Sequence, residues 1–201
     1  AASAVGMDKE LALAVFAQAG LRQTDYLVIR RSAWNVDRQG TIEDIEAKLR
    51  YPLFVKPVNL GSSIGISKVH DTQSLESAID LAAGYDLKIM VEASVENARE
   101  LECAVLGNDE PKASVIGEII PGAEFYDYTT KYIDDRSQLI VPAELPESIS
   151  GEIQRMSVDA FRSIDCAGLG RVDFLMTSSG NIFLNEINTM PGFTPISMYP
   201  R

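Results

Sequence analysis

The sequence has few of the residues on which common catalytic and metal centres depend. It contains one histidine and two cysteines among 201 residues, and no CxxC pair. Histidine is the usual proton carrier of nucleophilic triads, and His and Cys are the usual zinc ligands. His70 stands beside a turn at the end of ISKVHD. A triad built on His70 and a zinc site are therefore both disfavoured.

Basic charge is also scarce, with 18 Lys and Arg against 29 Asp and Glu and a net charge of -11. This balance argues against a nucleic acid or an anionic membrane as partner, although a local basic cluster can still bind an anion. No apolar run reaches the roughly 18 residues of a membrane span, and AASAVGMDKE has no signal-peptide pattern. Cys103 and Cys166 stand in apolar stretches and are interpreted as buried free thiols, with a disulfide as the alternative. We expect a cytoplasmic protein.

The hydrophobic content of 46% is enough for one large domain or two small ones. Strands and helices mix without strict alternation, which predicts an α+β fold. The polar joint at 93–98 is the best boundary, giving domains 5–93 and 94–201. Residues 121–137 are expected to form a long loop. Helices are expected over 7–20, 41–50 (opened by Thr41), 71–84 and 147–166, and strands over 26–30, 52–57, 66–69, 87–94, 99–107, 112–120 and a final hairpin at 170–192.

The final hairpin carries polar side chains inside apolar segments. A two-residue turn at Ser179-Gly180 would place Asp173 opposite Glu186 and Arg171 opposite Asn188. Because side chains alternate along a strand, these four would share one face. The other face would hold Phe174, Met176, Phe183 and Asn185.

Two like charges directly opposite each other destabilise a sheet, and burial adds to the penalty. A hard divalent cation such as Mg²⁺ would neutralise Asp173 and Glu186, and it usually completes its shell with phosphate and water. The alternative is a salt-bridged surface face with Arg171 between the two acids. The hairpin alone leaves both interpretations open.

The segment FVKPVNLGSSIGISKV offers a place for phosphate. Lys56 ends a strand, and the loop with Ser62, Ser63 and flanking glycines has N–H groups and hydroxyls that can surround phosphate oxygens. The loop matches neither a Walker A nor a GxGxxG pattern, so an ordinary turn is the alternative. Lys131 supplies another cation beside Tyr132, with a solvated lysine as the alternative.

Five segments together resemble the successive motifs of the D-alanine–D-alanine ligases, ATP-grasp enzymes of peptidoglycan synthesis in the bacterial cell wall. They are GMDK, KPVNLGSSIGISKV, FYDYTTKY, GRVDF and NEINTMPGFTPISMYP, in the family's order along essentially the whole chain. The resemblance implies an ATP-grasp fold of two subdomains, each with an antiparallel-rich sheet and helices, with the nucleotide held between them.

The resemblance also implies a nucleotide and metal site. Its phosphate ligands are Lys9, Lys56, Lys131 and the loop at Ser62 and Ser63. Its adenine and ribose contacts are Glu92, Ala93, Val95, Phe125 and Glu100. Its ligands for two Mg²⁺ ions, with Mn²⁺ as a possible substitute, are Asp173, Glu186 and Asn188.

The implied catalytic groups stabilise an oxyanion and position the substrates. Arg171 and the Gly192 amide would face the oxyanion, and Ser62 and Tyr132 would form a substrate network. Ser197 and Met198 would line the site of the second D-alanine. ATP would phosphorylate the first D-alanine, the amine of the second would attack the acyl phosphate, and phosphate would leave.

The sequence departs from the family pattern at both ends. The family normally begins with a further domain that supplies a glutamate to the first D-alanine, and it ends with a closing helix. We expect these 201 residues alone to bind nucleotide but show weak or no ligase activity. A homodimer is an expectation for the full-length protein only. The alternatives are a D-alanine–D-serine or D-lactate ligase of the same fold, or a nucleotide-binding module without catalysis.

Overall fold

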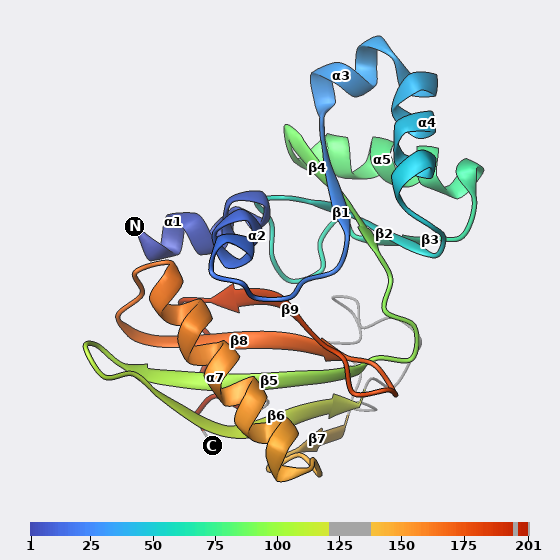
Figure 1. Ribbon diagram of the computed structural model, residues 1–201. Coiled ribbons are helices and arrows are strands. Elements are labelled where there is room, and N and C mark those ends of the chain that lie inside the picture. Colours follow the sequence, from blue (N-terminus) through green and yellow to red (C-terminus); the bar gives the residue numbers. More distant parts are fainter. Residues whose placement is uncertain (121–137, 195–196, 201) are drawn as a thin grey trace. The chain divides into compact units, whose positions relative to one another are not determined.

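The computed structural model describes residues 1–120, 138–194 and 197–200. The chain forms two compact units, which are described separately (Figure 1). One unit contains residues 24–94. The other combines residues 1–23 with the described part of the chain after Ser94. Both units contain antiparallel sheets and helices, so the predicted α+β fold is confirmed.

The unit of residues 24–94 has a four-stranded antiparallel sheet in the order β1-β4-β2-β3. Helix α5 packs on it through Leu75, Ala78, Ile79 and Ala82, which recur at helical spacing and are buried. These side chains form one core with Trp34 and the inward residues of the strands. The elements are β1 (Tyr26–Arg30), α3 (Arg31–Val36), α4 (Arg38–Lys48), β2 (Leu53–Pro57), β3 (Ser67–Val69), α5 (Thr72–Tyr85) and β4 (Lys88–Ala93).

The other unit has a five-stranded antiparallel sheet in the order β7-β6-β5-β8-β9. Helix α7 lies across one face of this sheet (Figure 1) and buries Ile153, Ala160 and Phe161 against it. Gly170 makes room for this contact, because a Cβ there would lie 3.2 Å from the Phe161 ring. The elements are α1 (Ala2–Met7), α2 (Lys9–Gln18), β5 (Arg99–Gly107), β6 (Lys112–Ile120), β7 (Gln138–Ile140), α7 (Glu147–Ser163), β8 (Gly168–Met176) and β9 (Ile182–Asn188).

The structure differs from the predicted elements near the N-terminus. Asp8 ends α1 and caps α2 by accepting a hydrogen bond from the Leu11 N–H. Helix α4 starts at Arg38 with Asp37 as its cap, so the predicted start at Thr41 is wrong. Helix α3 was not predicted.

The first 23 residues also belong to a different unit from the one predicted. Helices α1 and α2 pack on β9, and the Leu184 N–H donates to the Arg22 carbonyl at 2.9 Å. Residues 5–23 therefore have their contacts in the unit that contains the final hairpin. Among the described residues, no helix is long and apolar enough to cross a membrane.

Candidate functional site

The final hairpin brings Asp173 opposite Glu186 and Arg171 opposite Asn188, and both predicted pairings are confirmed. The predicted two-residue turn is wrong, because the Thr177 N–H donates to the Asn181 carbonyl and closes a longer connection. A register shift between Asp173 and Phe174 then restores the predicted pairing. Two single-residue deviations thus cancel before the polar pairs are reached.

The same shift changes the apolar face of the hairpin. Phe174 and Met176 share one face of β8 as predicted and are buried, but they pair with Leu184 and Ile182. Phe183 lies opposite Leu175 and is half-buried, so its predicted place beside Phe174 is wrong. The extra residue of β9 at the shift reverses the alternation on its turn side.

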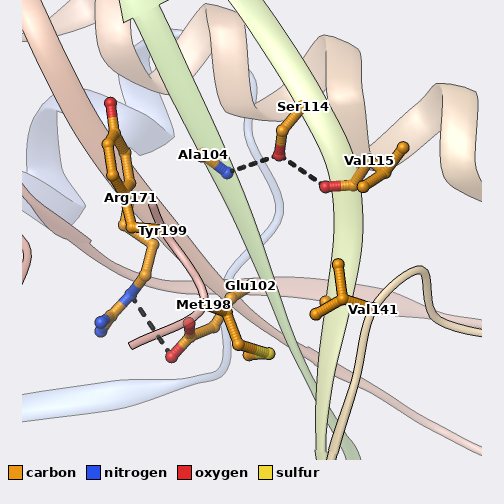
Figure 2. Close-up of a pocket in the computed structure, with 9 residues that line it drawn as sticks. Glu102, Ala104, Ser114, Val115, Val141, Arg171, Met198 and Tyr199 are labelled. Carbon is orange, nitrogen blue, oxygen red and sulfur yellow. Dashed lines mark hydrogen bonds and ion pairs between the residues drawn. The ribbon is translucent and has the colours of Figure 1, made fainter. Parts of the chain in front are cut away.

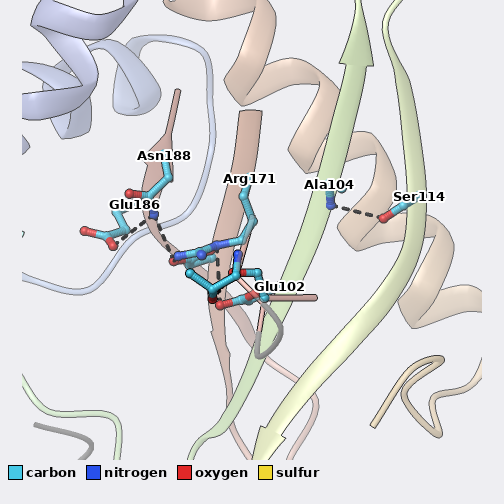
Figure 3. Close-up of polar contacts among 9 residues, drawn as sticks. Glu102, Ala104, Ser114, Arg171, Glu186 and Asn188 are labelled. Atoms are coloured by element: carbon cyan, nitrogen blue, oxygen red, sulfur yellow. Dashed lines mark hydrogen bonds and ion pairs between the residues drawn. The ribbon is translucent and has the colours of Figure 1, made fainter. Parts of the chain in front are cut away.

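Strand β5 adds a third acid to the polar face, because Glu102 pairs with Asp173 across β5 and β8. Glu102, Asp173 and Glu186 therefore stand in a row on three neighbouring strands, here named the acid row. Figure 3 labels its two outer members, Glu102 and Glu186. Glu102 was not predicted as a site residue. It stands two residues after Glu100 in RELECAVLG, so strand periodicity alone places it on the same face.

Each member of the acid row has a partner of opposite charge. Arg171 Nε and Nη2 donate to the two Asp173 carboxylate oxygens, each at 2.6 Å, and Arg171 Nε lies 3.4 Å from Glu102 Oε1. Lys9 Nζ, from the first turn of α2, lies 3.7 Å from Glu186 Oε2. Burial lowers the pKa of Arg171, but the charge and hydrogen bonds of Asp173, with Glu102 and Glu186, raise it above its usual value.

An amide links the two hairpin acids. Asn188 Nδ2 donates to Asp173 Oδ2 and to Glu186 Oε1, each at 3.2 Å. Arg171 neutralises Asp173, as the salt-bridge alternative supposed, while the Asn188 amide contacts both acids. Among the described residues, no three His, Cys, Asp or Glu side chains are grouped to hold a metal ion. The candidate metal set is two carboxylates and one amide.

In the unit of residues 24–94, Lys56 and Glu92 form a buried salt bridge at 2.5 Å, with 9% and 6% of their side chains exposed. The pairing of β2 with β4 brings these two predicted nucleotide ligands together. Ala93 ends β4, and its N–H donates to the Asp25 carbonyl. Val95 and Glu100 are half-buried and lie in the other unit.

The loop between β2 and β3 has an unusual backbone. Ser62 and Ser63 adopt φ of 54° and 57°, values that residues with a side chain rarely take. Gly65 has φ of 71°, and a Cβ there would lie 2.7 Å from Tyr85 Cδ2 and 3.0 Å from Pro57 Cγ. Glycine is thus required at 65 for both conformation and space.

The C-terminal segment packs beside the acid row. The Thr194 N–H donates to Ser197 Oγ at 3.2 Å, and a Cβ on Gly192 would lie 3.1 Å from that oxygen. Met198 packs on Gly117, where a Cβ would be 2.8 Å from its sulfur. Met198, Gly117 and the Glu102–Arg171 pair line a cavity of about 50 Å³ (Figure 2).

The remaining predictions concern the two cysteines, the histidine and three residues that the structure does not describe. Phe125, Lys131 and Tyr132 lie outside the described residues. Both cysteines are free thiols, and burial raises the pKa of Cys103. His70 is exposed, and its N–H donates to Ser74 Oγ at the start of α5.

Comparison with known proteins identifies the family. A family model described as "D-ala D-ala ligase C-terminus" matches residues 15–201. D-alanine–D-alanine ligases of Acetivibrio thermocellus and Bacillus cytotoxicus are 54% and 52% identical over 99% of this chain. The chain spans 53% and 55% of their lengths, about half of each relative.

Two solved structures are also similar. The VanG D-Ala:D-Ser ligase from Enterococcus faecalis matches with a TM-score of 0.87 and 40% identity, over 99% of this chain and 57% of that one. The D-alanine–D-alanine ligase from Coxiella burnetii matches with a TM-score of 0.84 and 37% identity, over 99% and 51%. The chain therefore belongs to the D-alanine–D-alanine ligase family, whose C-terminal part it matches, and it has the ATP-grasp fold predicted from its motifs.

Proposed function

We propose that this chain binds ATP with Mg²⁺, and that the protein to which it belongs joins two D-alanines for peptidoglycan synthesis. The observation that carries the proposal is the pairing of Asp173 with Glu186, with the Asn188 amide in contact with both. A sheet gains nothing from two directly opposed carboxylates, so a ligand is the best reason for them. Family membership supplies the class of reaction.

The donors fit a hard cation. Asp173, Glu186 and Asn188 offer carboxylate and amide oxygens, the ligand types that Mg²⁺ prefers, and Mn²⁺ takes the same set. Rotation of the Asn188 amide brings its oxygen to the place now taken by its nitrogen, between the two acids. We propose two ions here. When bound, they offset phosphate charge during phosphoryl transfer.

The phosphate ligands that we propose are cations already held near carboxylates. Lys9 is 9% exposed beside Glu186, and Lys56 is 7% exposed beside Glu92. An ammonium has three N–H donors, so each lysine can keep its carboxylate and still donate to a phosphate oxygen. Lys131 is proposed as the third cation.

The loop at Ser62 and Ser63 is proposed to close over the phosphates, and its strained backbone supports a functional role. The adenine contacts are proposed at Glu92, Ala93, Val95 and Phe125, and the ribose contact at Glu100. Because the Ala93 N–H already binds the Asp25 carbonyl, Ala93 would offer adenine its carbonyl oxygen.

The chemistry then depends on groups around the acid row. Arg171 and the Gly192 N–H are proposed to stabilise the oxyanion that forms when the second amine attacks the acyl phosphate. Ser62 and Tyr132 orient the substrates, and Ser197 with Met198 bounds the space for the second D-alanine. The Met198 packing on Gly117 supports this placement, because it holds the thioether against the sheet.

Ligation to D-serine is the second candidate, favoured by the similarity to the VanG ligase. Met198 at the second-substrate position favours D-alanine, since a thioether offers no strong hydrogen bond to a substrate hydroxyl. Dipeptide formation by the complete protein with D-alanine or D-serine as the second substrate distinguishes the two.

Calorimetry of ATP binding to this chain, with and without Mg²⁺, tests the proposal. We expect Mg²⁺-dependent binding that is lost in Asp173→Asn/Glu186→Gln. A matched control, Asp159→Asn/Glu152→Gln, makes the same chemical changes at exposed positions of α7 and should bind like the wild type. Equal binding by both double variants, or none by the wild type, would contradict the metal site.

A further inference from the structure

Three acids and Arg171 share the polar face of β5, β8 and β9, and the contacts of Arg171 with these acids are unequal. Asp173 holds Arg171 through two hydrogen bonds of 2.6 Å, whereas Glu102 lies 3.4 Å from the same guanidinium. Asp173 is thus the main partner of Arg171 in the metal-free chain. It is also one of the proposed metal ligands.

These two roles of Asp173 compete. A carboxylate oxygen that binds a divalent cation cannot at the same time accept a short hydrogen bond along the same lone pair. A cation on such a lone pair weakens the contact between Asp173 and Arg171, whose side chain is only 23% exposed. A buried cation that loses part of its anionic partner is destabilised, so another carboxylate within reach of the guanidinium favours metal binding.

Glu102 meets that requirement. It is the neighbour of Asp173 on the strand away from Glu186, and its side chain is only 12% exposed. Both Glu102 and Arg171 line the cavity of about 50 Å³ (Figure 2), so the guanidinium has space to move toward Glu102. We propose that Glu102 is a positioning residue, which accepts hydrogen bonds from the Arg171 guanidinium when a divalent cation binds Asp173. This inference rests on the proposed metal site.

The proposal explains why the acid row has three members. Glu186 and Asp173 serve the cation, and Glu102 keeps Arg171 on the same face for the oxyanion. Without Glu102, Arg171 would remain on Asp173 and compete with the metal. Glu102 therefore favours cation binding through Arg171 rather than by contact with the ion.

A double-mutant cycle separates this role from a simple charge effect. The probe is Mn²⁺, measured by electron paramagnetic resonance on the full 201-residue chain with and without ADP. We expect Glu102→Gln to weaken Mn²⁺ binding by about tenfold, the order expected for one lost charge-assisted contact. In the Arg171→Gln background the same substitution should weaken binding by less than about threefold, because no guanidinium then competes for Asp173.

Glu102→Asp gives a second measurement that keeps the charge. Its shorter side chain withdraws the carboxylate from Arg171, so we expect weaker Mn²⁺ binding, as for Glu102→Gln. For NMR, Mg²⁺ replaces the paramagnetic Mn²⁺. The chemical shift of the Arg171 Nε–H should change when Mg²⁺ is added to the wild type, and it should change less in both Glu102 variants.

The outcomes distinguish this inference from the proposed function. Glu102→Gln could weaken Mn²⁺ binding by the same factor with and without Arg171, or Glu102→Asp could bind Mn²⁺ like the wild type. Either result would overturn the role of Glu102 without contradicting the metal site. A wild-type chain that binds neither Mn²⁺ nor Mg²⁺ would overturn both. Unequal factors, with weakened binding in Glu102→Asp, would support the transfer of Arg171.

Discussion

Neutralising either hairpin acid should have unequal effects on stability without metal. Asp173→Asn removes the carboxylate that accepts two 2.6 Å hydrogen bonds from Arg171. Glu186→Gln removes a carboxylate whose Oε2 lies 3.7 Å from the Lys9 ammonium. We expect Asp173→Asn to leave the unit that contains the acid row less stable than Glu186→Gln does, by about 2 kcal/mol.

The structure sets the magnitudes. Breaking a buried ion pair costs about 3–5 kcal/mol, and we take about 2–3 kcal/mol here, because the two side chains are 23% and 16% exposed. The Lys9 pair is longer and Glu186 is 30% exposed, so its loss costs below about 1 kcal/mol. Each acid has an oxygen 3.2 Å from Asn188 Nδ2. These oxygens are therefore at most about 6.4 Å apart, and their repulsion is roughly 2.6 kcal/mol or more at an effective dielectric of about 20.

Both variants remove that repulsion, so the difference between them is the cost of losing the Arg171 contact less the smaller cost of losing the Lys9 contact. Hydrogen–deuterium exchange of β8 and β9 amides, in the presence of a chelator, measures the local free energy of opening. Trp34 is the single tryptophan and lies in the other unit, so its fluorescence in urea serves as an internal control. Equal losses in the two variants, or an equal shift of the Trp34 transition, would refute the reasoning.

Two further predictions concern the unit of residues 24–94. Gly65→Ala places a Cβ 2.7 Å from the Tyr85 ring at a φ of 71°. We therefore expect its affinity for ATP, measured by calorimetry, to fall at least about tenfold. Gly61→Ala is the control, because a Cβ at Gly61 has open space around it, and it should bind ATP nearly normally. Asp80 accepts a hydrogen bond from Trp34 Nε1 at 2.8 Å, and this bond lowers its pKa below the usual 3.8. Because the pKa of Asp80 is lowered, its carboxylate stabilises the fold at pH values above 3.8, and this stabilisation is lost as the pH falls through the lowered pKa. Trp34 fluorescence should therefore report a loss of stability below about pH 4 that is less steep in Asp80→Asn, and an unchanged slope would contradict this role.

The polar face of the hairpin could be predicted because strand alternation has a short period. Arg171, Asp173, Glu186 and Asn188 needed only an antiparallel pairing and an approximate register. The turn was predicted wrongly, and the pairing held only because the bulge in β9 offsets the longer connection. The sequence contains no clear signal for either deviation, because Ser-Gly does not specify one turn type.

Contacts between segments that are distant in the sequence could not be predicted from local sequence patterns. The Lys56–Glu92 salt bridge depends on β2 lying beside β4, which no spacing within either strand indicates. The start of α4 was missed for a local reason, since both Asp37 and Thr41 are acceptable helix caps. Glu102 was missed although its periodicity was visible, because no local pattern in RELECAVLG indicates that β5 pairs with β8.

The two faces of the five-stranded sheet have opposite physical characters. On one face, β5 and β8 bury Leu101, Cys103, Val172 and Phe174, and α7 covers this side of the sheet. On the other, β5, β8 and β9 carry the acid row, whose mutual repulsion is offset by Arg171, Lys9 and the Asn188 amide. Stability can therefore come from the α7 face while the polar face keeps carboxylates that would be unfavourable without a cation. This division lets an otherwise destabilising row persist, and it places the least locally consistent part of the sequence at the proposed metal site.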